Sequence, residues 1–209
     1  MSSSHSNPEH TKKVVVFELG TAQRLHVVGI GGPGMSALAR SLVAMGHHVS
    51  GSDIRPSENI AQLKELGINI SIGHNEELVV GCDAVCASSG VPSDNIEMAA
   101  ARRAGIPALS RAEMLAAVCA SGTAIGVAGT HGKTTTTTLV ALMLGGAEGE
   151  CGFVVGGDAP GLQTNGAWSH TGLFVVEADE SDGTHEALPL RGAVITNIDT
   201  DHLDHFGSF

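Results

Sequence analysis

Short segments that read as strands recur along the first half of the chain, and the first of them, Leu25–Ile30, is nearly continuously apolar, as is typical of a strand that is buried on both faces of a sheet. They are bounded by Gly, Pro, Asn and Ser residues, which favour turns. The strands predicted in this way are Leu25–Ile30, His48–Ser52, Ile68–Ile72, Ala84–Ser88 and Ile106–Leu109.

Between these runs the apolar residues return at helical spacing. The segment from Met35 to about Met45 predicts a helix that ends at Gly46, a residue type that favours the end of a helix. Further helices are predicted at Ser57–Leu66 and at about Asn95–Ala104. Strands that alternate with helices predict a parallel α/β sheet.

A second unit with the same pattern begins near Ser121. The predicted strand Thr123–Ala128 leads through a glycine-rich turn into a helix from about Lys133 to Leu144. Leu173–Val176 and Ala193–Ile198 read as two more buried strands. We therefore expect a disordered tail at 1–20, a Rossmann-like parallel-sheet α/β domain at 21–120, and an incomplete P-loop ATPase-type α/β domain at 121–209.

Composition narrows the function classes. Apolar residues make up 42% of the chain and the net charge is -11, which favours a globular protein and argues against a nucleic-acid partner. No apolar stretch approaches the ~20 residues of a membrane helix, and no signal peptide is evident. The four cysteines lack paired spacing, so we expect free, buried thiols and a cytoplasmic protein.

The sharpest chemical signal is the glycine-rich turn that opens the helix at Lys133. Backbone N–H groups of such a turn hold phosphates, Lys133 would reach the β- and γ-phosphates, and the Thr134 hydroxyl would bind Mg²⁺. The strict P-loop spacing requires glycine where this chain has Val127. The alternative is a turn beside an ordinary surface lysine. The candidate phosphate-binding residues are Gly129, Thr130, His131, Gly132, Lys133, Thr134 and Thr135.

A second glycine-rich turn, Gly29–Gly34, follows the first strand, and Asp53 ends the next strand. This is the fingerprint of a dinucleotide site. Such a turn can hold the diphosphate of NAD or of a UDP-sugar, or it can be a tight turn with no ligand. Pro33 lacks an N–H group and so offers the loop one donor fewer.

Acidic residues follow the last two predicted strands, at the sheet edge where α/β proteins bind ligands. Carboxylates suit Mg²⁺, although each one alone could be a solvated loop charge. A zinc site at His202 and His205 is a weaker alternative, since no third ligand is evident. The two groups are Glu177, Asp179, Glu180 and Asp182, and Asp199, Asp201, His202 and Asp204.

Four motifs together resemble the Mur ligases of peptidoglycan synthesis, and among them the members that act on UDP-N-acetylmuramate and L-alanine. The similarity runs from about Arg24 to Phe209 with the motifs in order. These motifs are Gly29-Ile-Gly-Gly-Pro-Gly-Met-Ser36, Gly129-Thr-His-Gly-Lys-Thr-Thr-Thr-Thr137, Glu177-Ala-Asp-Glu-Ser-Asp182 and Asp201-His-Leu-Asp204.

The resemblance implies an ATP- and Mg²⁺-dependent ligase in which Lys133, Glu177 and His202 are catalytic. It implies that Thr134 and Glu177 hold one metal ion and that Glu177 and His202 hold a second. The lactyl carboxylate of UDP-N-acetylmuramate would form an acyl phosphate, which the amine of L-alanine attacks. The implied UDP-sugar residues are Gly31, Gly32, Gly34, Met35, Asp53, His74, Ser88 and Ser89.

Family members continue past the position of Phe209 with the rest of the ATPase domain and a third domain. We therefore expect this chain to be a truncated and inactive part of such an enzyme. An NAD-dependent oxidoreductase and a non-catalytic nucleotide-sugar-binding module remain as alternatives. The amino-acid substrate and the oligomeric state stay open.

Overall fold

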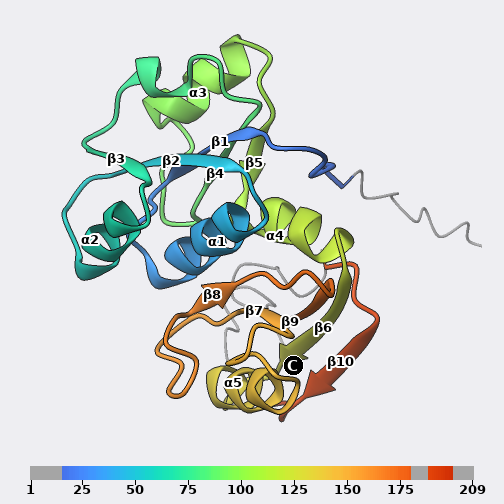
Figure 1. The fold of residues 1–209 in the computed structure, drawn as a ribbon. Helices are drawn as coiled ribbons and strands as arrows, with labels where there is room; N and C mark the ends of the chain where they lie inside the picture. The colour runs from blue at the N-terminus through green and yellow to red at the C-terminus, as the bar shows by residue number, and fades with distance from the viewer. Residues whose placement is uncertain (1–15, 180–187, 200–209) are drawn as a thin grey trace, which may run out of the picture.

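The computed structural model describes residues 16–179 and 188–199 of the 209-residue chain, and shows two five-stranded sheets (Figure 1). The first sheet is parallel throughout, with the strand order β3-β2-β1-β4-β5. Its strands are β1 Arg24–Val28, β2 His48–Asp53, β3 Asn69–Ile72, β4 Ala84–Ala87 and β5 Ala108–Ser110. The α/β class and the parallel sheet predicted from the sequence are thus confirmed.

Helices cover both faces of the first sheet. In Figure 1, α3 lies above this sheet, while α1 and α4 lie below it, between the two sheets. The helices are α1 Pro33–Ala44, α2 Glu58–Glu65, α3 Ile96–Arg103 and α4 Arg111–Ala120, with a short 3₁₀ helix, η1, at Glu76–Val79.

Side-chain caps explain where several of these helices begin. The Ser57 hydroxyl accepts a hydrogen bond from the Ile60 N–H at the start of α2, and the Asn95 side chain caps α3 in the same way. At α4, Ser110 and Glu113 form a reciprocal capping box. Each cap satisfies backbone donors that the first helical turn leaves without a partner.

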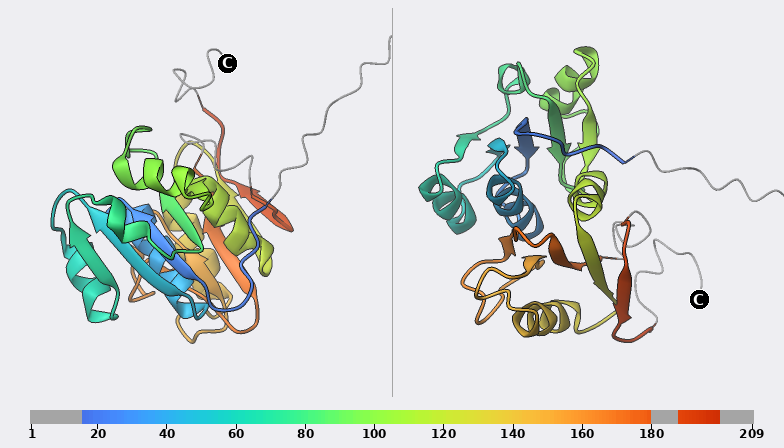
Figure 2. Two further views of the ribbon diagram at one scale, coloured as in Figure 1. Left: turned by 90° about the horizontal axis from the view of Figure 1, so that it is seen from above. Right: turned by 45° about the vertical axis from the view of Figure 1, so that its right-hand side comes forward.

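The second sheet has the order β10-β6-β9-β7-β8, with α5 Lys133–Met143 on its outer face (Figure 2). Strands β7 and β8 pair antiparallel, and the other described pairs are parallel. The strands are β6 Thr123–Ala128, β7 Gly152–Val154, β8 Gly166–Ala167, β9 Leu173–Glu177 and β10 Gly192–Ile195.

One hydrophobic cluster joins the two sheets through α1 and α4. Leu38 of α1 and Leu115 of α4 belong to the same buried cluster as Val154 and Phe174 of the second sheet. Burial of such side chains is the main term that stabilises contacts of this kind. The two glycine-rich turns are therefore held on one packed body.

Several elements differ from the sequence prediction. Strand β10 is exposed, because it lies at the edge of the sheet with β6 on one side, whereas we expected a buried strand over Ala193–Ile198. Strand β5 begins later than predicted, at Ala108. Helix α4 and the short strands β7 and β8 were not predicted, because α4 is apolar around most of its circumference and the strands are very short. Residues 1–15 of the predicted tail lie outside the described residues.

Candidate functional site

The first glycine-rich turn lies where the strand order of the first sheet reverses. Strand β1 pairs with β2 on one side and β4 on the other, and ligands of α/β proteins bind in the crevice at such a point. A cavity of about 510 Å³ opens there. Among the residues predicted to bind a UDP-sugar, those that line it are Gly31, Gly32, Asp53, His74 and Ser88.

Asp53 holds the glycine-rich turn in place. Its Oδ2 accepts the Gly31 N–H at 2.8 Å, and the Asn59 side chain donates to the Gly31 carbonyl at 2.9 Å. A Cβ atom at Gly31 would lie 2.9 Å from the same Asp53 oxygen, so any larger residue there would displace the Asp53 side chain. Asp53 thus shapes the cavity as well as lining it.

The N-terminus of α1 faces this turn. Pro33 is the first residue of α1, where a missing N–H costs no helical hydrogen bond. The N–H groups of Gly34 and Met35 belong to the first helical turn and so have no partner within the helix. The Met35 side chain is buried in the core. Only the backbone of Met35 is thus placed to contact a ligand.

Ser89 lies apart from the other predicted sugar-binding residues. It lines a neighbouring cavity of about 320 Å³, together with Ser110 and Arg111, and Ser88 lines both cavities. The structure therefore brings together most of the predicted residues of this group and leaves Ser89 beside them.

The second glycine-rich turn connects β6 to α5. Val127 lies in β6 and is fully buried, so the strand continues where a standard P-loop would already have turned. The turn is made by Gly129, with φ +127°, and Gly132, with φ +81°, which are values that favour glycine. The Lys133 ammonium group donates to the Gly129 carbonyl at 2.8 Å. Thr135 is exposed on the first turn of α5.

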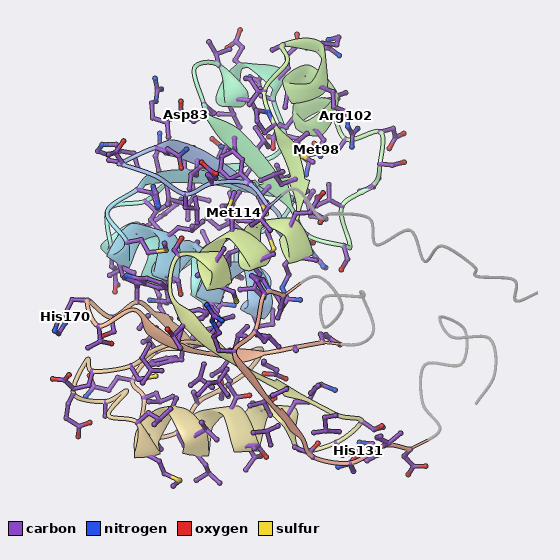
Figure 3. The ribbon with its side chains drawn as sticks, turned by 90° about the vertical axis from the view of Figure 1, so that its right-hand side faces the viewer. Asp83, Met98, Arg102, Met114, His131 and His170 are labelled. Carbon is purple, nitrogen blue, oxygen red and sulfur yellow. The ribbon has the colours of Figure 1, made fainter. Side chains whose placement is uncertain are left out.

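Thr196 and Asn197, which the sequence analysis missed, hold this turn from the end of β10. The Asn197 side chain accepts the His131 N–H at 3.0 Å and donates to the His131 carbonyl at 2.9 Å. The Thr196 hydroxyl donates to the same carbonyl at 2.6 Å, and Thr130 is hydrogen-bonded to the Asn197 carbonyl. Figure 3 shows His131 at one end of the second sheet and His170 at the other. No sequence motif identifies this clamp.

Thr134 and Glu177 meet beside the turn. The Thr134 hydroxyl donates to Glu177 Oε1 at 3.0 Å, and the Gly156 N–H donates to Oε2 at 2.6 Å. Gly156, which follows β7, was not singled out in the sequence. A hydroxyl and a carboxylate are hard oxygen donors of the kind that Mg²⁺ prefers, and Mg²⁺ is held by few protein ligands. The Thr134 hydroxyl and the Glu177 carboxylate are therefore suited to bind Mg²⁺.

The remaining predicted metal ligand, His202, lies outside the described residues, as do Glu180, Asp182, Asp201, Asp204 and His205. Of the acidic groups, Asp179 and Asp199 are described alongside Glu177. The Asp199 N–H donates to the Thr130 hydroxyl at 3.1 Å, which places Asp199 beside the second glycine-rich turn. Residues 16–179 and 188–199 contain no group of three or more His, Cys, Asp or Glu side chains suited to a metal ion.

The four cysteines are free thiols, as predicted, and Cys86, Cys119 and Cys151 are buried. Burial raises the pKa of the Cys86 and Cys119 thiols to about 12, so both are protonated and unreactive at neutral pH. Across the described ranges, no helix has the length and apolar character needed to cross a membrane.

Two family models match the chain in series. The Mur ligase family, catalytic domain, matches residues 24–123, and the Mur ligase middle domain matches residues 127–209. A UDP-N-acetylmuramate–L-alanine ligase of Rhodopseudomonas palustris is 47% identical over 88% of this chain. The ligase of the same name from Rhodospirillum centenum is 48% identical over 94% of it. The chain spans 40% of the length of each of these two relatives.

Two solved structures are also similar to this chain. UDP-N-acetylmuramate–alanine ligase from Thermotoga maritima matches with a TM-score of 0.79 and 34% identity, over 88% of this chain and 44% of that one. UDP-N-acetylmuramate:L-alanyl-gamma-D-glutamyl-meso-diaminopimelate ligase from Neisseria meningitides matches with the same TM-score and 29% identity, over 88% of this chain and 63% of that one. From the two α/β sheets, the two glycine-rich turns and these similarities together, the chain belongs to the Mur ligase family.

Proposed function

We propose that this chain carries the nucleotide-sugar site and the ATP-phosphate site of a cytoplasmic ligase that joins L-alanine to UDP-N-acetylmuramate. The observation that carries the proposal is the contact between Thr134 and Glu177 beside Lys133, at the N-terminus of α5. This arrangement offers a cation, hard oxygen ligands and a helix N-terminus to one triphosphate.

The reaction has two steps. The lactyl carboxylate attacks the γ-phosphate of ATP and releases ADP, and the amine of L-alanine then displaces phosphate from the acyl phosphate to form the amide. Phosphoryl transfer depends on positioning and on neutralising charge. Lys133 supplies positive charge at the β- and γ-phosphates, and the turn at Gly129–Gly132 supplies backbone contacts.

Thr134 and Glu177 would hold Mg²⁺, with Glu177 and His202 at a second ion. Bound Mg²⁺ neutralises phosphate charge during the transfer. The Gly156 N–H and the Thr134 hydroxyl orient the Glu177 carboxylate, so the side chain is already directed at this position. At the other turn, the N–H groups of Gly34 and Met35 are the ones we assign to the UDP diphosphate.

An NAD-dependent oxidoreductase is not favoured. The Gly29–Gly34 turn alone would suit a dinucleotide, but that function leaves Lys133, Thr134 and Glu177 without a role. A nucleotide-sugar-binding module without phosphate chemistry has the same difficulty. The proposed ligase requires ATP and neither alternative does, so a measurement of ATP binding distinguishes the ligase from both.

Isothermal titration of the 209-residue chain with ATP in Mg²⁺, UDP-N-acetylmuramate and NADH tests the proposal. We expect Lys133→Ala to weaken ATP binding about tenfold or more, because charged contacts to phosphate are strong, and to leave UDP-sugar affinity within about twofold. Lys64→Ala, an exposed lysine of α2, is the matched control. Tight NADH binding, or equal loss of both ligands in Lys133→Ala, would contradict the assignment.

A further inference from the structure

A fully buried carboxylate lies behind the cavity of the first sheet. Glu97, in the first turn of α3, has 0% exposed surface. It accepts hydrogen bonds from the Ser52 hydroxyl at 2.6 Å, from His26 Nε2 at 3.3 Å and from the Asn75 N–H at 3.1 Å. Burial opposes its charge, but these hydrogen bonds outweigh that effect and lower the pKa of Glu97, so the group is ionised at neutral pH.

An ionised carboxylate accepts hydrogen bonds and cannot donate them, which sets the direction of every bond around it. The Ser52 hydroxyl has one hydrogen, and the short contact to Glu97 Oε2 uses it. The Ser52 oxygen must therefore accept from its other partner, which is His74 Nδ1 at 3.1 Å. His74 Nδ1 also lies 3.3 Å from Glu97 Oε1.

His74 consequently carries its hydrogen on Nδ1. In a neutral imidazole the other nitrogen is then an acceptor. His26 is held in the opposite form, because its Nε2 faces Glu97 and must donate, so its Nδ1 accepts from Ser50 at 2.8 Å. One buried carboxylate thus dictates opposite tautomers for two histidines.

The other ring nitrogen of His74, Nε2, is available to a ligand in the cavity. His74 is 19% exposed and lines the cavity at the glycine-rich turn. Its Nε2 has no hydrogen-bond partner among residues 16–179 and 188–199, and it is not buried. A molecule bound in this cavity therefore meets the lone pair of His74 Nε2, which can accept a hydrogen bond.

We propose that Glu97 is a positioning residue that, through Ser52, holds His74 as the Nδ1–H tautomer, so that Nε2 accepts a hydrogen bond from a nucleotide-sugar donor group. This inference rests on the proposed function, because it takes a UDP-sugar as the occupant of the cavity. A neutral acceptor does not suit a phosphate oxygen, which has no hydrogen to give. The donor is the imide N–H of uracil or a hydroxyl of the ribose.

The tautomers are measured directly in the unliganded chain. Two-bond ¹H–¹⁵N correlation spectra separate the two forms of histidine, and the spectrum of His74→Asn assigns the signal. We expect His74 as Nδ1–H and His26 as Nε2–H. A His74 ring with its hydrogen on Nε2 would overturn the proposal, whether or not any ligand binds.

Two substitutions at His74 distinguish its hydrogen bond to Ser52 from its hydrogen bond to a ligand. An Asn side chain can keep the N–H near Ser52 but does not reach the position of Nε2, whereas Gln can offer an acceptor oxygen there. We expect His74→Asn to weaken UDP binding about tenfold, because a ligand donor loses its partner, and His74→Gln to recover part of that loss. Equal affinities in wild type and both variants would refute an acceptor at this position.

Glu97→Gln tests the positioning step, since the amide nitrogen supplies a donor where the carboxylate accepts. We expect the Nδ1–H form of His74 to decrease and UDP to bind about threefold to tenfold more weakly. Ser52→Ala, which removes the intermediate hydroxyl, serves the same purpose if Glu97→Gln does not fold. Glu76→Gln, whose ion pair with Arg103 is exposed, is the matched control and should change neither measurement. Unchanged tautomer and affinity in the folded variants would remove Glu97 from this role.

Ligand analogues identify the donor. CDP has a lone pair in place of the imide N–H, and 2′- and 3′-deoxy-UDP each lack one ribose hydroxyl. The analogue that loses the interacting donor should bind the wild type more weakly than UDP, with the difference absent in His74→Asn. If every analogue binds as UDP does, the inference fails while the nucleotide site stands. If UDP and UDP-N-acetylmuramate do not bind at all, the proposed function fails.

Discussion

Glu177 is almost buried, with 8% of its surface exposed, and each of its carboxylate oxygens receives one hydrogen bond. Such bonds hold the side chain in one direction before any ion arrives. Lys133 stands at the first position of α5, where the helix dipole disfavours a cation. A bound phosphate would stabilise the Lys133 ammonium group at this end of α5, and a bound metal ion would stabilise the nearly buried Glu177 carboxylate.

We expect Glu177→Gln to raise the Mg²⁺ concentration needed for half-maximal ATP binding by about tenfold. The amide keeps the shape but loses the charge, and Mg²⁺ has few protein ligands to compensate. Titrating ATP into the chain over a series of Mg²⁺ concentrations measures this. Glu148→Gln, an exposed glutamate, should behave as wild type. An unchanged Mg²⁺ dependence in Glu177→Gln would place the ion elsewhere.

Glu97 predicts a dependence of stability on pH. Its pKa is lowered from 4.5, so its hydrogen bonds stabilise the fold above the unfolded pKa, and this stabilisation is lost as pH falls through the folded pKa. Glu97→Gln should therefore lower the free energy of unfolding by about 2–3 kcal/mol at pH 7. The difference from wild type should shrink below about pH 4. Urea unfolding at several pH values measures it, and a constant difference would contradict ionised Glu97.

At the scale of single elements, side chains at α5 and α4 form hydrogen bonds with the backbone of their own helix. Helix α5 contains a run of threonines, which favour strands. Thr137 and Thr138 nevertheless donate to the carbonyls of Lys133 and Thr134, each one turn earlier, and so suit a helix here. Helix α4 depends on the Ser110–Glu113 capping box at its start.

Ser110→Ala should lower the free energy of unfolding by about 1 kcal/mol, because the Glu113 N–H then has no cap. Ser93→Ala is the matched control, since Ser93 is exposed and its side chain makes no described hydrogen bond. Urea unfolding of both variants measures the difference. Equal stability of the two would show that α4 does not need this cap.

At the scale of the whole molecule, the two sheets depend on a close backbone approach. The Gly166 Cα in β8 lies against the Ala37 carbonyl of α1, so that an added Cβ would collide with that carbonyl. Beside this contact, the Ser41 hydroxyl lies 3.3 Å from the Ala167 carbonyl and 3.5 Å from the Phe153 carbonyl. Residues more than a hundred positions apart therefore hold the two candidate sites at a set distance.

Gly166→Ala should force α1 away from β8 and lower the free energy of unfolding by about 1–3 kcal/mol. Gly192→Ala is the control, because a Cβ there meets only ordinary van der Waals contact. Urea unfolding followed by the fluorescence of Trp168 in wild type and both variants measures the loss. Stability equal to that of Gly192→Ala would show that the two units adjust without cost.

The resemblance to the Mur ligases implied that Thr134 and Glu177 share a metal ion. The sequence by itself determined the α/β class and both glycine-rich turns. These features depend on local spacing, because buried parallel strands are continuously apolar and phosphate-binding turns require glycine at set positions. The free thiols also followed from spacing alone. In these cases the physical cause lies within a few residues of the motif.

Only the tertiary structure decided the rest. The clamp of Thr196 and Asn197 on the His131 backbone, the direction of Glu177 set by Gly156, and the exposure of β10 each depend on strands that are distant in sequence. The tautomer of His74 depends on Glu97 and Ser52, which come from separate elements. Apolar periodicity shows that a segment is buried, but hydrogen-bond partners and sheet edges depend on which strands become neighbours, and the chain pattern does not encode that locally.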